Sequence, residues 1–327
     1  MATQGSKPWD GNNLIVEVGD FDQVLRDASA AKYLRPYRQA TEMLYDKDRW
    51  CLWLNNADPS ELKTSPVLRE RLAAVREARL SSPTAPVREL ADTPSRFAQD
   101  RQPTTTYVAL PEVSSSNRDY IPGRYYDADT IAGNKLILFP DCPAWLFGYL
   151  QSRPFTAWVK TFAGRLKSDI SISPGLTYFT FPFIQPEGKD LQAIEAAVQG
   201  VLDARAAHPN SCLADLYDPL AMPKDLRDAH KALDKAVLGL YGLKPDATES
   251  EILAALIARY KELDSACRLP LPTSGTAKVS PRAGKSLSRA ATIRAWAIQN
   301  GFAITPRGRI PSDVIDAFDQ AQETGNS

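Results

Sequence analysis

The sequence predicts a mixed α/β domain, then an all-α domain, and finally a small two-helix unit. Short apolar runs of strand type alternate with amphipathic helical patterns in the first part of the chain. Residues 190–264 instead repeat their apolar positions at helical spacing. A segment rich in proline, glycine and serine separates them from the last two helical patterns. We therefore expect four segments, with the bounds 1–186, 187–266, 267–286 and 287–327.

Strands are expected in the first domain where β-branched, aromatic and other apolar residues gather in short runs. A helix is expected between the first two of these runs. Asp58 is a good N-cap for it, Pro59 suits the first helical position, and Glu61 follows three residues after the cap. The runs that predict strands are residues 49–54, 106–110, 135–139 and 178–181.

Apolar and basic residues fall on different faces of this first helix. Leu68, Leu72 and Val75 mark the face that should be buried. The arginines expected on the other faces are Arg69, Arg71, Arg76 and Arg79. A second helix is expected over residues 144–160, which are rich in tryptophan, leucine and phenylalanine.

The rest of the chain is expected to be helical apart from the 267–286 segment. Loops should fall at residues 208–210 and 218–219, where proline interrupts the pattern. In the last unit, Ser288 should cap a helix that stops near Asn300. Pro311 should then lie in the first turn of a second helix.

The formal net charge of zero hides an uneven distribution. Residues 1–189 hold 23 basic and 22 acidic side chains, and residues 190–265 hold 8 basic and 13 acidic ones. Residues 266–312 carry 8 basic side chains and no acidic one, whereas residues 313–327 sum to −4. A concentrated basic segment of this kind is typical of contact with nucleic acid.

Several classes of protein are disfavoured by the sequence. No apolar run approaches the roughly 20 residues that a membrane span needs, and the N-terminus lacks the apolar core of a secretion signal. We therefore expect a cytoplasmic, nucleoid-associated protein without a membrane partner. The four widely spaced cysteines form no C-x-x-C pair, so no metal site is expected. His208 and His230 are interpreted as exposed helix residues.

No catalytic residue or cofactor is expected in this chain. It lacks the [NDS]-P-P-[YFW] loop of adenine methyltransferases, a glycine-rich loop for the methyl donor, and a Walker A sequence. Glu61-Leu62-Lys63 after Asp58 resembles part of a nuclease site, but the helix cap explains Asp58 and Glu61. Whether the protein takes part in an enzyme stays open at this point.

The tail carries an Arg307-Gly308-Arg309 sequence in the acid-free segment. Its two guanidinium groups lie about 7 Å apart in an extended chain, with no side chain between them. The narrow, negative A·T minor groove attracts arginines of this kind. A solvated basic linker is the alternative. Phosphate contacts are expected from Lys278, Arg282, Lys285, Arg289 and Arg294.

Residues 291–302, 307–311 and 314–318 resemble the C-terminal DNA-binding domain of the Lsr-type nucleoid-associated silencers of actinobacteria. The resemblance covers about 38 residues and implies A·T-rich minor-groove binding. The oligomerisation domain of that family has no counterpart in the sequence. Filament-forming silencing is therefore not implied.

The front of the chain contains four distinctive motifs, at residues 32–37, 49–54, 113–122 and 164–169. Together they resemble the target-recognition domain of MmeI-like type IIL restriction–modification enzymes. Residues 213–223 and 229–237 resemble the helical region that ends those enzymes. Their methyltransferase and nuclease domains precede the recognition domain. The resemblance thus implies target reading without catalysis. We expect a separate methyltransferase or nuclease subunit as partner, such as a site-specific DNA adenine-N6 methyltransferase, although the sequence does not show one.

In that family a charged pair two residues apart after Gly-Arg-Leu reads bases, and here the pair is Lys167 and Asp169. Lysine can donate to guanine O6 and N7, while aspartate accepts from cytosine N4. A surface ion pair is the alternative interpretation. The resemblance further implies base contacts by Ser171 and Lys135. The arginines expected to bind phosphate are Arg118, Arg153 and Arg165, each of which could instead form a structural ion pair.

Three functions remain compatible with the sequence. The first is a stand-alone specificity subunit that brings a separate methyltransferase or nuclease to double-stranded DNA. The second is the C-terminal fragment of a type IIL enzyme or DNA adenine methyltransferase. The third is a regulatory or nucleoid protein that binds DNA without an enzyme partner. The reading frame next to the gene would discriminate between them.

Overall fold

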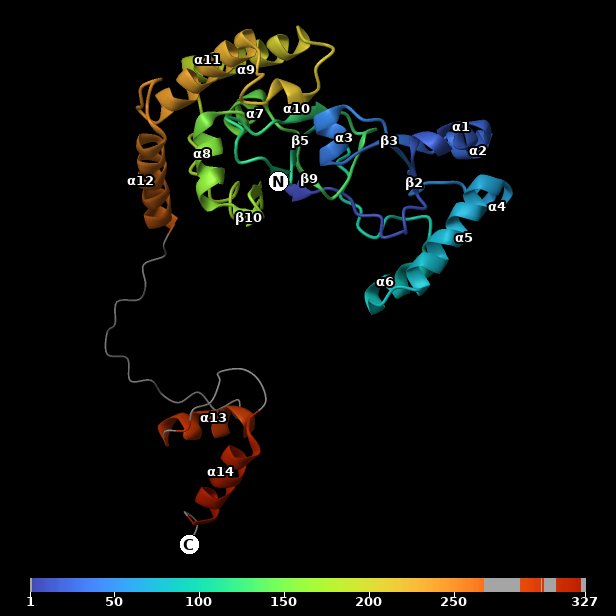
Figure 1. Cartoon of the computed structure of the whole chain (residues 1–327), viewed down its shortest axis with the longest axis vertical. Helices are drawn as coiled ribbons and strands as arrows, with labels where there is room; N and C mark the ends of the chain where they lie inside the picture. Colours follow the sequence, from blue (N-terminus) through green and yellow to red (C-terminus); the bar gives the residue numbers. More distant parts are fainter. Residues whose placement is uncertain (1, 268–288, 301, 303–309, 325–327) are drawn as a thin grey trace. The chain divides into compact units, whose positions relative to one another are not determined.

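The structure is a computed structural model that describes residues 2–267, 289–300, 302 and 310–324. The chain divides into two compact units, Met1–Cys267 and Arg268–Ser327. Figure 1 labels the helices and strands of both units. The boundaries expected near residues 186, 266 and 286 stay predictions.

The first sheet of the larger unit has the strand order β2-β4-β3-β8, and only the β3–β8 pair is parallel. A core that includes Leu14, Leu52, Leu68 and Val75 lies beside it. The strands are β2 (Ile15–Val16), β4 (Trp50–Leu52), β3 (Leu34–Arg38) and β8 (Ile131–Ala132). The helices of this part are α1 (Val18–Arg26), α2 (Ala28–Ala31), α3 (Ala40–Tyr45), α4 (Pro59–Thr64), α5 (Pro66–Leu80) and α6 (Ala85–Glu89), followed by the 3-10 turn η1 (Leu90–Asp92).

The second sheet has the order β1-β9-β5-β7 and is antiparallel throughout. Every residue of β5 is buried, as expected of a strand that is covered on both faces. The strands are β1 (Thr3–Gln4), β9 (Leu136–Pro140), β5 (Tyr107–Pro111) and β7 (Arg124–Tyr126). Two helices follow β9 in the chain, α7 (Ala144–Leu150) and α8 (Arg153–Phe162).

The helical part shares one apolar core with this second sheet. Phe147 of α7 lies in the same cluster as Ile194 and Leu233. A Cβ atom added to Gly148 would lie 2.8 Å from Ile194, so glycine permits the close approach of α7 to α9. Figure 1 shows α9 and α11 side by side over α7. The helices of this part are α9 (Gly188–Ala206), α10 (Leu213–Leu216), α11 (Lys224–Leu240) and α12 (Glu249–Cys267).

The smaller unit pairs α13 (Arg289–Gln299) with α14 (Ser312–Thr324). Its core is formed by Ile293, Ala297, Val314 and Phe318. The order expected from the sequence, a mixed α/β part followed by helices and a two-helix unit, is therefore confirmed. Among the described residues, no helix is both long and apolar enough to cross a membrane.

Two helices expected to be continuous are each broken by a proline. Pro66 separates α4 from α5, and the Ser65 side chain accepts a hydrogen bond from the Leu68 backbone as a new N-cap. Pro154, in the first turn of α8, similarly separates it from α7. Proline has no backbone N–H to continue the hydrogen-bond ladder of a preceding helix. The cap at Asp58 is confirmed, since its side chain accepts from Ser60 N.

The strand expected at residues 178–181 was wrong. The backbone N–H groups of Tyr178 and Phe179 both donate to the Pro174 carbonyl, at 3.1 and 2.9 Å, so the segment is a series of turns. Tyr178 and Phe181 still join the core, where Phe181 lies 4.7 Å from Phe183 between ring centroids, whereas Phe179 is exposed. An apolar run shows that a segment is buried, but it does not determine the backbone conformation.

Arg79 was expected on an exposed face of its helix, but the structure buries it at 1% exposure. Its guanidinium donates five hydrogen bonds to backbone carbonyls at 2.6–3.0 Å. All five N–H donors are thereby satisfied, which offsets the cost of removing the group from water. The acceptors are the carbonyls of Pro8, Trp9, Leu90, Thr93 and Arg96.

Candidate DNA interface

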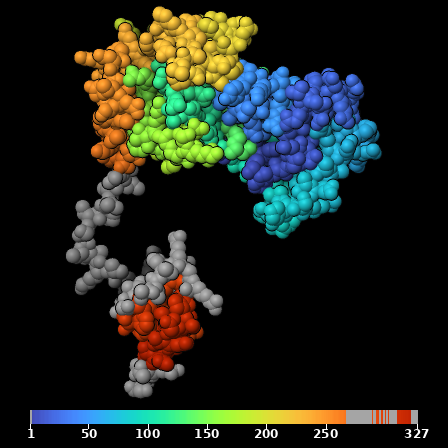
Figure 2. All heavy atoms as spheres, in the orientation of Figure 1, coloured from blue at the N-terminus to red at the C-terminus, as the bar shows by residue number. Residues whose placement is uncertain are grey.

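A short hairpin carries three of the residues expected to read bases. Strand β10 (Gly164–Leu166) runs into β11 (Asp169–Ser171) through the two-residue turn Lys167–Ser168. Lys167 adopts a positive φ of 56°, a conformation that costs energy for a residue with a Cβ. Figure 1 shows β10 beyond the end of α8. In Figure 2 the light-green atoms, which include this region, lie at the surface of the larger unit.

The hairpin extends into a three-stranded sheet with the order β10-β11-β6, where β6 is Val113–Ser114. Ile170 lies opposite Ser114 and Ser171 lies opposite Val113. Because directly opposed residues share a face, Ile170 and Ser114 point to one side, where both are buried. Asp169 and Ser171 therefore lie together on the other, more accessible face. The sheet joins two motifs that are about 50 residues apart in the chain.

Lys135 lies next to this sheet through its contacts with Glu112. The Glu112 carbonyl accepts from Ile172 N at 2.7 Å, and Glu112 N donates to the Lys135 carbonyl at 2.9 Å. The Lys135 ammonium pairs with the Glu112 carboxylate at 2.8 Å while 58% of the lysine side chain stays exposed. Gln4 donates its side-chain N–H to the same carboxylate at 2.9 Å.

Glu112 is thus a polar residue of this region that the sequence analysis missed. Its two neighbours, Lys135 and Gln4, come from distant parts of the chain. The only signal in the sequence was an acidic residue directly after a buried apolar strand. The structure therefore brings Ser171 and Lys135 to the 112–114 segment, while Asp169 and Lys167 follow at the hairpin end of the same sheet.

The arginines expected to bind phosphate lie in different surroundings. Arg165, on β10, is exposed and donates to the Lys160 carbonyl at 3.0 Å. Arg118 follows β6 in the 115–118 turn and is partly exposed. Arg153 lies at the start of α8, where its guanidinium donates to the Ala247 carbonyl at 2.9 Å. Arg165 and Arg118 thus adjoin the three-stranded sheet, whereas Arg153 contacts the loop before α12.

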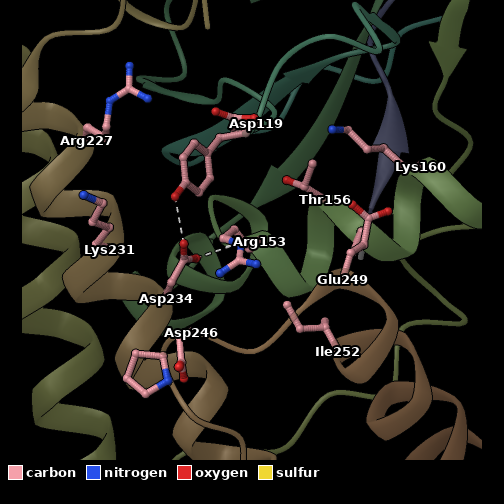
Figure 3. A pocket seen from close by; sticks show the side chains of 13 residues that line it. Asp119, Arg153, Thr156, Lys160, Arg227, Lys231, Asp234, Asp246, Glu249 and Ile252 are labelled. Atoms are coloured by element: carbon pink, nitrogen blue, oxygen red, sulfur yellow. Dashed lines mark hydrogen bonds between the residues drawn. The ribbon is translucent and has the colours of Figure 1, made fainter.

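Arg153 lines a cavity of about 510 Å³ between α8, α11 and the start of α12 (Figure 3). At its base, the buried Asp234 carboxylate accepts from Arg153 N at 2.8 Å and from the Tyr120 hydroxyl at 2.7 Å. Burial raises the pKa of Asp234 to about 6. Side chains of both charges line the cavity. The basic ones are Lys160, Arg227 and Lys231, and the acidic ones at its rim are Asp119, Asp246 and Glu249.

His230 was interpreted as exposed, but it is fully buried beside this cavity. Its ring stacks on Tyr120 with a centroid distance of 4.0 Å, and its Nε2 lies 2.8 Å from the Tyr217 hydroxyl. Burial lowers the pKa of His230 to about 3, so the ring is neutral at physiological pH. The other histidine, His208, pairs with Asp225 at the surface.

In the tail, only part of the predicted interface falls on described residues. The Arg289 guanidinium forms hydrogen bonds of 2.8 and 2.7 Å with both carboxylate oxygens of Asp319, which ties α13 to α14. Arg294 lies on the same helix and is partly exposed. The tail residues that lie outside the described part are Lys278, Arg282, Lys285, Ser288, Arg307, Gly308 and Arg309. In the part of the chain that the structure describes, no His, Cys, Asp and Glu side chains gather into a metal site.

A family model for the MmeI target recognition domain matches residues 1–185, which is more than half of the chain. The chain belongs to the MmeI family. The model of the MmeI C-terminal domain matches residues 186–267 of this MmeI-family chain, and that of the Lsr2 DNA-binding domain matches residues 286–321. Both resemblances drawn from the sequence are therefore confirmed.

Two relatives of this MmeI-family chain show how far the similarity extends. The structure of the type IIL restriction–modification enzyme MmeI in complex with DNA is 39% identical with a TM-score of 0.78, over 81% of this chain and 35% of that one. DNA methyltransferase A of Bacillus subtilis (strain 168) is 34% identical over 260 residues, which are 79% of this chain and 30% of that protein. The chain spans about a third of the length of each relative.

Proposed function

We propose that the chain is the sequence-reading component of a restriction–modification or phage-defence system. The accessible face of the β10-β11-β6 sheet would contact base edges in the major groove, which admits a two-stranded β-ribbon. The Arg-Gly-Arg tail would bind an A·T-rich minor groove beside the site. A separate methyltransferase or nuclease chain would carry out the reaction.

The observation that carries this proposal is the gathering of polar side chains on one sheet face. Asp169 and Ser171 share that face, and Lys167 is held at the hairpin turn in a left-handed conformation. No carboxylate of the described residues forms an ion pair with Lys167 within 4.0 Å, so its ammonium is available to an acceptor. A lysine and an aspartate presented together can read the two edges of one G·C pair.

A selection of bound duplexes from a random pool tests this proposal. The full chain is expected to enrich one defined motif. Exchanging the two charges, with Lys167→Asp and Asp169→Lys, is expected to change the preferred base at one position of that motif. Each good base contact is worth roughly 1–3 kcal/mol of discrimination, or about 5- to 150-fold.

The matched control exchanges an exposed ion pair on α11, with Lys224→Asp and Asp228→Lys. Their side chains lie 2.7 Å apart and far from the hairpin in sequence, and the exchange also preserves the net charge. The control should enrich the unchanged motif. If the hairpin exchange also leaves the motif unchanged, the sheet face does not read that base pair.

A second candidate function follows from the length of the relatives. Because the chain spans about a third of each, this second candidate is the C-terminal fragment of a DNA adenine methyltransferase or restriction enzyme. This candidate predicts an adjacent reading frame that encodes an N-P-P-[YF] loop. A specificity subunit predicts, in addition, that the two separately purified chains form a complex that methylates the selected motif.

A further inference from the structure

Leu166 occupies an unusual place for an aliphatic side chain. It is the last residue of β10, an edge strand, and 56% of it is exposed. Exposed leucines are common on protein surfaces and carry little information alone. An apolar residue on an edge strand does, however, favour unwanted pairing with other chains. The residues next to Leu166 in the sheet indicate why its side chain is exposed.

Leu166 lies directly opposite Asp169 in the register of the hairpin. Opposed residues share a face, so Leu166 lies on the same accessible face as Asp169 and Ser171. Val113 completes this face, because it lies opposite Ser171. Gly164 adds no side chain on the other side of Ser171, and a Cβ there would approach only Ser171, at 3.7 Å. The face thus combines polar groups with two apolar side chains.

The charges around Leu166 suit a nucleic-acid partner. Lys167 follows it and is exposed, whereas the exposed Arg165 lies opposite Ile170 and therefore on the other face of the hairpin. The Lys167 ammonium next to Leu166 can bind a guanine edge while the apolar side chain approaches the neighbouring base. In the major groove, the apolar feature of a base edge is the C5 methyl group of thymine.

We propose that Leu166 is a specificity-determining residue that contacts a thymine methyl group next to the base pair contacted by Lys167 and Asp169. This inference rests on the proposed function, because it takes the same sheet face to enter the major groove. Leu166 and Asp169 lie side by side across the hairpin, so the thymine is expected directly beside the position whose preference the charge exchange changes.

The test removes the methyl group and the side chain separately. Each thymine of the selected motif is replaced in turn by deoxyuridine, and affinity is measured for the wild-type chain and for Leu166→Ala. At one thymine, the replacement should weaken wild-type binding by roughly 3- to 10-fold, as expected for one buried methyl group. In Leu166→Ala the same replacement should have almost no effect.

Two variants sharpen this comparison. Leu166→Met keeps an apolar side chain of similar volume and should retain the methyl effect. Leu25→Ala removes a leucine of similar exposure, 52%, from α1 and should behave as the wild type. Since Leu166 lies outside the apolar clusters of the described residues, its variants are expected to fold.

The outcomes separate this inference from the proposed function. If the wild-type chain enriches no motif, the proposed function fails. If it enriches a motif whose deoxyuridine penalties are the same in wild type and Leu166→Ala, only the role of Leu166 is overturned. A motif without thymine near the position set by Lys167 and Asp169 would overturn it as well.

Discussion

At the scale of single residues, the structure assigns unlike tasks to chemically similar side chains. Asp169 and Asp234 are both aspartates, but one lies on the accessible sheet face and the other is buried below a cavity at 2% exposure. Burial penalises the charged form of a carboxyl group, whereas water supports it. Asp234 is therefore a determinant of stability, whereas a role in base reading is proposed only for the accessible Asp169.

Asp234 makes a pH dependence of stability testable. Its pKa is raised from 3.8 to about 6 in the folded chain, because burial disfavours the carboxylate. A raised pKa means that its stabilisation is complete below the unfolded value near 3.8 and is lost as the pH rises through about 6. Between pH 4 and pH 7 the wild type should therefore lose about 2 kcal/mol relative to Asp234→Asn.

Urea unfolding of the larger unit, followed at several pH values, measures this difference. Asp228→Asn is the control, since Asp228 lies on the same helix but is exposed and paired with lysines. Its profile should remain close to that of the wild type. Parallel profiles for wild type and Asp234→Asn would show that the Asp234 carboxyl does not titrate in this range.

Burial was harder to predict from the sequence than local motifs. Lys167 and Asp169 were proposed as base-reading residues because a local motif contains both, and that role stays a prediction. His230 and Arg79 were misplaced, because their burial depends on partners that are far away in the chain. The rings and hydroxyl around His230 belong to Tyr120 and Tyr217, and the acceptors for Arg79 include Pro8 and Arg96.

At the scale of elements, turn chemistry predicted helix ends well where it was applied. Asp58 and Pro59 marked the start of α4 correctly. The same pattern recurs at Ser65 and Pro66, where the apolar periodicity obscured it and the helix was taken as continuous. The pairing of β11 with β6 could not be predicted from either segment, because short strands contain no signal for a partner about 50 residues away.

Arg79 provides a test of how α5 is fastened to the rest of the unit. Arg79→Ala should destabilise the larger unit by about 3 kcal/mol or more, because five backbone carbonyls lose their donor at once. Arg76→Ala, an exposed site on the same helix, should change stability by less than about 0.5 kcal/mol. Thermal unfolding of both variants measures the contrast, and equal effects would contradict the anchoring role.

At the scale of the whole molecule, two DNA-binding modules occur in one chain. The MmeI target recognition domain and the Lsr2 DNA-binding domain match separate parts of it. The 21 residues from 268 to 288 connect α12 to α13 and can span roughly 75 Å at most. Covalent connection raises the effective concentration of one module once the other has bound, provided that both sites lie within reach.

The span of residues 268–288 therefore predicts how the affinity of the chain for DNA depends on the position of an A·T-rich tract. At 3.4 Å per base pair, a tract within about 20 base pairs of the motif lies inside the span, whereas one 60 base pairs away lies roughly 200 Å off on a stiff duplex. The wild-type chain should bind the duplex with the near tract more tightly. Arg307→Ala with Arg309→Ala should abolish this difference in affinity between the two duplexes and reduce the salt slope by roughly 1–2 units.

The control, Arg69→Ala with Arg76→Ala, removes the same charge from exposed sites on α5 and should keep the difference. Titrations of both duplexes at several salt concentrations decide the matter, because a tail that only adds diffuse charge would give both double variants the same loss and leave the preference for the near tract intact.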